Sequence, residues 1–107
     1  MSMLQYLESL SSSEQKKIVN SANTDLIKLF SEICKNLTHR NINLTHSQIK
    51  KLKKFESDIL KLSQKKHSVT TRKKILTSGN FLSVFLSEII PSLIDIILSH
   101  HEKNVHG

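Results

Sequence analysis

The chain has 107 residues, with one cysteine, two glycines and one proline, and its 16 basic and nine acidic residues give a formal charge of +7. This length allows a single small domain with a modest core. The scarcity of turn-forming residues argues against a β-sandwich. One cysteine excludes an internal disulfide, so Cys34 is expected to be a small buried hydrophobe in an intracellular protein.

Three helices are expected before residue 40. Residues 3–10 are rich in apolar side chains, and their Glu8 and lack of a basic start do not fit a signal peptide. Ser11 and Glu14 have the spacing of a capping box, which predicts a helix to about Ala22. Asn23 or Thr24 can cap a third helix, whose apolar stripe predicts a core face: Leu26, Ile27, Leu29, Phe30, Ile33, Cys34 and Leu37.

The basic charge is concentrated in residues 45–76. They hold ten basic and two acidic residues, a formal charge of +8, whereas the remaining residues sum to −1. Thr45 with Gln48 again has capping-box spacing, so a central helix is expected from His46 to about Ser63. Its apolar residues recur at spacings of three and four, which predicts one buried face: Ile49, Leu52, Phe55, Ile59 and Leu62.

A second basic helix is expected to follow a turn at residues 64–67. Ser68 can cap it, and Gly79 suits the left-handed position after its end near Thr77. The segment 45–76 is therefore predicted to be a folded two-helix platform that presents basic side chains rather than a solvated tail. The candidate nucleic-acid-binding residues are Lys50, Lys51, Lys53, Lys54, Lys61, Lys65, Lys66, Arg72, Lys73 and Lys74.

Two interpretations of this charge remain open: a merely solvated helix face, or contact with the phosphates of a polyanion. Lysine dominates, only two arginines occur in the whole chain, and aromatic residues are few. That composition favours phosphate contacts over base reading or base stacking. DNA, RNA, anionic lipid and an acidic protein surface all offer closely spaced negative charge, so the pattern alone does not choose among them.

Residues 81–98 form a largely apolar stretch that is expected to be helical, with Pro91 either kinking the helix or dividing it in two. Glu88, Asp95 and Pro91 argue against a membrane span. Burial in the core, oligomerisation and insertion into an anionic membrane surface are the alternatives for this helix. The residues that would serve a membrane or a partner are Phe81, Leu82, Phe85, Leu86, Ile89, Ile90, Leu93, Ile94 and Ile97, and residues 100–107 are expected to be a flexible tail.

A series of short motifs from Glu32 onward gives the chain a resemblance to a known family. In order, these are Glu32-Ile33-Cys34, Asn41-Ile42-Asn43-Leu44-Thr45 with Gln48, Leu52-Lys53-Lys54-Phe55, Lys65-Lys66 with Ser68, Arg72-Lys73-Lys74 with Leu76, and Gly79-Asn80-Phe81-Leu82. The order resembles the small basic protein X of adintoviruses and Polinton (Maverick) elements, a family likened to the adenovirus core peptide X. The resemblance implies a virion-associated protein of a double-stranded DNA virus, located in the virion and, during assembly, in the host nucleus or cytoplasm. It implies no catalytic residues.

Nothing in the sequence recommends an enzyme. No Gly-rich phosphate loop, nucleophile elbow or paired-carboxylate motif is present, and the six histidines lack the spacing of a metal site. We therefore expect a compact all-α bundle of five or six short helices, with neither cofactor nor metal. The leading hypothesis is a virion or core protein that binds duplex DNA without sequence specificity. The alternatives are a membrane-active or capsid-anchoring protein acting through residues 81–98, and a scaffold that forms a helical homo-oligomer.

Overall fold

The computed structural model describes the backbone of residues 3–106 and the side chains of residues 3–93. Across residues 3–106 it contains helices and no strand, so the predicted all-α class is confirmed. The helices are α1 (Met3–Glu8), α2 (Ser12–Ser21), α3 (Thr24–Thr38), α4 (His46–Leu52), the 3-10 helix η1 (Lys53–Phe55), α5 (Glu56–Ser63), α6 (Val69–Leu76) and α7 (Phe81–His106). Because α4, η1 and α5 follow one another without a gap, these residues form six helical stretches, in agreement with the expected five or six.

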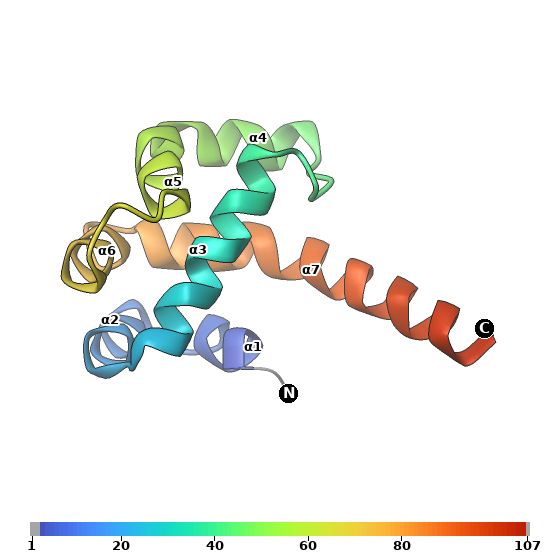
Figure 1. The fold of residues 1–107 in the computed structure, drawn as a ribbon, viewed down its shortest axis with the longest axis horizontal. Coiled ribbons are helices and arrows are strands. Elements are labelled where there is room, and N and C mark those ends of the chain that lie inside the picture. The colour runs from blue at the N-terminus through green and yellow to red at the C-terminus, as the bar shows by residue number, and fades with distance from the viewer. Residues whose placement is uncertain (1–2, 107) are drawn as a thin grey trace.

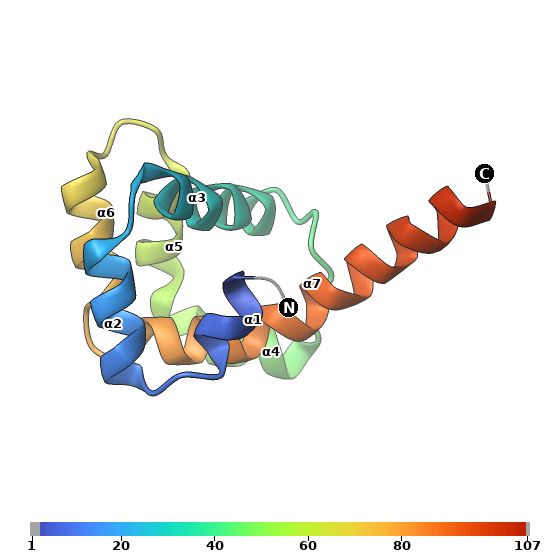
Figure 2. The same ribbon diagram turned by 90° about the horizontal axis from the view of Figure 1, so that it is seen from below.

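The first half of α7 lies at the centre of the fold. Helices α1, α2, α4 and α6 all contact it, while α3 packs against α5 and α6 (Figure 1). The second half of α7 leaves the body and projects from it, as Figures 1 and 2 both show. The body therefore surrounds one end of α7, and the other end forms an arm.

All four phenylalanines of the chain are buried, and they form a connected cluster. The Phe81 ring stacks on that of Phe85 at 5.2 Å between centroids and meets the edge of Phe55 at the same distance. Phe85 in turn lies 6.0 Å from Phe30 on α3. Such ring pairs stabilise a core beyond their area burial alone, so the cluster joins α3, η1 and α7. Cys34 is also buried, as expected, and burial raises the pKa of its thiol to about 12.

Local sequence signals start α3, α4 and α6, and end α6, where this was expected. Asn23 accepts a hydrogen bond from the Asp25 amide at the start of α3, and Thr45 forms a complete capping box at the start of α4. Ser68 caps α6 by accepting from the Thr71 amide. Gly79 has a φ of 53°, in the left-handed region that glycine adopts without strain. These signals need only neighbouring residues, which is why the sequence reveals them.

Three expectations about the helices differ from the structure. The central helix has the expected ends, but the 3-10 turn η1 interrupts it, and α4 and α5 run in different directions (Figures 1 and 2). Two residues expected on buried stripes are exposed, Leu29 at 41% and Ile49 at 51%, because each lies at the edge of its helix's apolar face. The last helix, expected over residues 81–98, continues as far as His106, because residues 92–106 contain no Gly or Pro to end it.

Candidate polyanion-binding surface

The basic segment folds as a bent platform whose underside belongs to the core. Leu52 at the end of α4 and Phe55 in η1 are buried, and so are Ile59 and Leu62 on α5. The 3-10 turn brings residues three apart onto one side, so Leu52 and Phe55 can both face the core while the chain turns. After this turn α5 packs against α3, whereas α4 packs against α7. The bend thus allows one amphipathic segment to cover two parts of the core.

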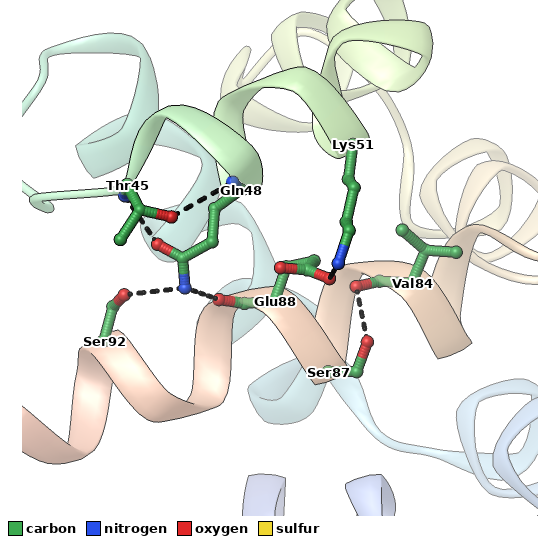
Figure 3. A network of polar contacts seen from close by, with 7 residues as sticks. All are labelled: Thr45, Gln48, Lys51, Val84, Ser87, Glu88 and Ser92. Carbon is green, nitrogen blue, oxygen red and sulfur yellow. Dashed lines mark hydrogen bonds and ion pairs between the residues drawn. The ribbon is translucent and has the colours of Figure 1, made fainter.

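Gln48 fixes the start of this platform to α7 (Figure 3). Its side-chain oxygen accepts the Thr45 amide at 2.7 Å, which completes the capping box. Its Nε2 donates to the carbonyl of Glu88 at 2.9 Å and to the Ser92 hydroxyl at 3.4 Å. Pro91 has no N–H and disrupts helical hydrogen bonding in the preceding turn of α7. Gln48 thus bonds α7 within the turn that precedes Pro91, and Lys51 adds an ion pair with Glu88 at 3.3 Å.

Replacing Gln48 by Ala should lower the free energy of unfolding by about 1–2 kcal/mol, because the side-chain half of the capping box and the α7 contact are both lost. The Thr45 hydroxyl still accepts the backbone amide of residue 48. Gln48→Glu separates the two roles. A glutamate at this position can still accept the Thr45 amide, but it has no donor for the Glu88 carbonyl. Urea denaturation should show that Gln48→Glu also destabilises the chain, whereas an unchanged midpoint would show that the contact with α7 contributes nothing.

Four of the ten candidate basic residues are engaged within the fold. Arg72 is buried, at 9% exposure, and its Nη2 donates to the Gln64 carbonyl at 2.9 Å. Lys73 donates to the carbonyls of Asn20 and Ala22 at 3.1 and 2.8 Å, at the C-terminal end of α2. Lys51 pairs with Glu88. The Lys54 ammonium lies 5.0 Å from the centre of the Phe55 ring, within cation–π range.

The other six lysines are exposed and make no hydrogen bond or ion pair with any described side chain. They are Lys50, Lys53, Lys61, Lys65, Lys66 and Lys74. The two acids of the segment, Glu56 and Asp58, form no ion pair with them within the described part of the chain. Free ammonium groups of this kind stay hydrated and are available to phosphates.

Five of the six free lysines lie in two groups, one at each end of α5. Lys50 and Lys53 lie before α5, whereas Lys65 and Lys66 follow its end in the turn that leads to α6. An eight-residue helix is about 12 Å long. Lys61 near the end of α5 belongs with the second group, and Lys74 lies towards the end of α6. The arrangement suits an extended polyanion better than a small anionic ligand.

Most of the apolar residues proposed to contact a membrane or a partner are buried in the core. Residues Phe81, Leu82, Phe85, Leu86, Ile89 and Ile90 are all buried, and Leu93 is half-buried. Ile94 and Ile97 lie outside the residues whose side chains are described. Within the described residues no single helix is long and apolar enough to cross a membrane, although α6 and Phe81–Leu93, bent by 87°, pass that test as a pair by length and composition.

The described side chains offer few functional groups other than the lysines. Among residues 3–93, no group of three or more His, Cys, Asp or Glu side chains could hold a metal ion. His100, His101 and His106 lie outside that range. The surface feature that distinguishes this part of the chain is its free lysines.

Sequence reasoning missed the internal roles of Arg72 and Lys73 and the second contact of Gln48. The helical pattern of α6 does not show which flank meets α2, and the partners of Gln48 are 40 and 44 residues away in the chain. The sequence predicted only that Gln48, three residues after Thr45, would take part in the helix cap.

The chain was compared with known protein families, curated proteins and solved structures. No family model, curated protein or solved structure matches the chain. The class that the fold defines is a small all-α protein with a bent basic platform and a projecting terminal helix.

Proposed function

We propose that the chain binds duplex DNA without sequence preference, through the six free lysines of residues 50–74. The observation that carries the proposal is that these ammonium groups are exposed and without internal partners, while the acids of the same segment do not neutralise them by ion pairing. Lysines that contact phosphates release condensed counterions, and this release supplies most of the affinity in nonspecific binding.

The surroundings of the lysines favour binding without base recognition. Of the two arginines in the chain, Arg72 is buried, so the platform offers no exposed guanidinium for a bidentate contact with guanine. The four phenylalanines are also buried, which leaves none of them to stack on bases. A surface of this composition contacts the phosphate backbone and reads little of the sequence.

The biological setting that we propose follows the resemblance to protein X. The chain would be a non-enzymatic component of a virion, associated with the viral genome and with capsid proteins as neighbours. It would pass through the host nucleus or cytoplasm during assembly. The partner would be the double-stranded genome itself.

Salt dependence of duplex binding tests the proposal. If all six free lysines contact phosphates, the plot of log affinity against log salt should have a slope of about −5. Fluorescence anisotropy with two unrelated 20-base-pair duplexes should give the same slope and similar affinities. Polyglutamate should compete only weakly with the duplex. No binding at low salt, or a strong preference for one duplex, would refute nonspecific DNA binding.

A second candidate function is favoured by the arm of α7. The arm projects from the body (Figures 1 and 2), and its sequence contains Ile94, Ile96, Ile97 and Leu98. It could join copies of the chain into a helical homo-oligomer, or anchor the chain to a capsid protein or an anionic membrane. Because the first half of α7 is buried, a membrane role for that half would require the fold to open. Light scattering and liposome binding distinguish an oligomer from a membrane anchor.

A further inference from the structure

The turn between α5 and α6 combines several groups that suit an anion. Ser68 caps α6: its hydroxyl accepts the Thr71 amide at 3.1 Å and donates to the Thr71 hydroxyl at 3.0 Å. The amides of Val69 and Thr70 donate no backbone hydrogen bond, as expected for the first turn of a helix. Free amides at this end of a helix point outward with a partial positive charge, which favours an anion.

Arg72 provides a second and independent indication of a ligand. Its side chain is more than nine-tenths buried, its Nε is enclosed and has no hydrogen-bond partner, and its one described hydrogen bond runs from Nη2 to the Gln64 carbonyl. No carboxylate pairs with it, since the ion pair described for residues 3–93 is that of Lys51 with Glu88. A buried guanidinium without a counter-charge is costly, and an anion at its outer edge would lower that cost.

The guanidinium of Arg72 lies against the turn that leads to α6. The contact with Gln64 places the guanidinium beside the first residue of the turn, which ends at the cap Ser68. His67 is held to the same glutamine, with its Nε2 3.2 Å from Oε1 of Gln64. Nε is enclosed, and Nη2 uses one of its two N–H donors on Gln64, so the donors left for a ligand are those of Nη1 and the second N–H of Nη2. Lys65 and Lys66 lie in this turn, exposed and without partners.

We infer that the turn at residues 64–68 and the first turn of α6 form a binding site for one phosphate group. The amides of Val69 and Thr70 and the remaining Nη N–H groups of Arg72 would donate to the phosphate oxygens, and the ammonium groups of Lys65 and Lys66 would add charge. The assignment of this phosphate to a DNA backbone rests on the proposed function. The same donors could also bind free phosphate, and the experiment uses separate probes to distinguish free phosphate from a DNA backbone phosphate.

The site can be tested by ¹⁵N NMR on the full chain, with inorganic phosphate and a 20-base-pair duplex as separate probes. Inorganic phosphate should shift the Val69 and Thr70 amide signals saturably, while the amides at the start of α2 stay still. The double variant Lys65→Gln with Lys66→Gln alters only exposed side chains and should weaken phosphate binding about tenfold. Lys50→Gln with Lys53→Gln removes the same charge from the other group and should leave phosphate binding unchanged.

Arg72→Gln should abolish saturation by phosphate, and the dispersion of its amide spectrum shows whether the fold is kept. If this variant does not fold, the comparison of the two double lysine variants still tests the phosphate site. Equal weakening by both pairs, or shifts at Val69 and Thr70 that do not saturate, would overturn the site.

The duplex probe separates this inference from the proposed function. Shifts of the Val69 and Thr70 amides by DNA, reversed by added phosphate, would support both. DNA binding without these shifts would overturn the backbone-phosphate assignment and leave the lysine surface in place. Saturable phosphate binding without DNA binding would support the site as one for free phosphate and refute the proposed function.

Discussion

Replacing Phe85 by Ala is expected to lower the free energy of unfolding by about 3–5 kcal/mol, the range found when a buried phenylalanine is truncated. Phe85 is fully buried, and its ring contacts those of Phe30 and Phe81. A typical domain has a free energy of unfolding of about 5–15 kcal/mol, so this loss would be a large part of the total. Chemical denaturation followed by circular dichroism measures it, with Phe85→Leu as a milder variant if the alanine variant does not fold.

Tyr6→Ala is the matched control, because Tyr6 is an aromatic residue on a helix that contacts α7 but is 48% exposed. It should cost less than about 1 kcal/mol. The pair of variants also tests the role of α7. If Phe85→Ala were no more destabilising than Tyr6→Ala, this part of α7 would not be the core that the structure shows, and its apolar residues would be free for a membrane or a partner.

Reversing four of the free lysines should remove most of the DNA affinity. With Lys50, Lys53, Lys65 and Lys66 changed to Glu, two of the six proposed contacts remain, so the salt slope should fall from about −5 to about −2. Affinity at low salt should fall at least about 100-fold. Fluorescence anisotropy across a salt series measures both quantities.

The control variant carries the same charge in another place. Each Lys→Glu change lowers the formal charge by two, so either set of four takes the chain from +7 to −1. The control set is Lys16, Lys17, Lys28 and Lys35, on α2 and α3. It should keep the slope near that of the unmodified chain, with a smaller loss of affinity. Equal losses in the two variants would mean that binding follows net charge rather than the platform.

The features that the sequence predicted well are those that depend on near neighbours. The caps at Asn23, Thr45 and Ser68 and the left-handed Gly79 are set by a few residues each, so the helix starts could be predicted closely. The apolar spacing also indicated most of the buried face of α3 and most of that of the central helix, the exceptions being Leu29 and Ile49. The class of the fold followed from these local signals.

The sequence could not predict which basic residues the fold would use. Lys73 and Lys74 are adjacent and chemically the same, yet one is bonded to the end of α2 and the other is exposed. The difference arises from the packing of α6 on α2, some 50 residues away in the chain. The burial of Arg72 and the turn at η1 likewise depend on how α5, α6 and α7 meet. Periodicity identifies a charged face, but packing decides which of its charges stay free.

The hydrogen bonds of Gln48 also fix α7 at one point along its length, which would be the pivot for any tilt of the arm. They hold the helix at Glu88 and Ser92, on both sides of Pro91, while the residues beyond Ser92 extend from the body (Figures 1 and 3). The arm from Ser92 to His106 has fifteen residues, or about 22 Å of helix. A rotation of about 10° at the pivot would move its tip by about 4 Å. Such a rotation would leave the basic helices in place, because they lie on the side that Gln48 holds.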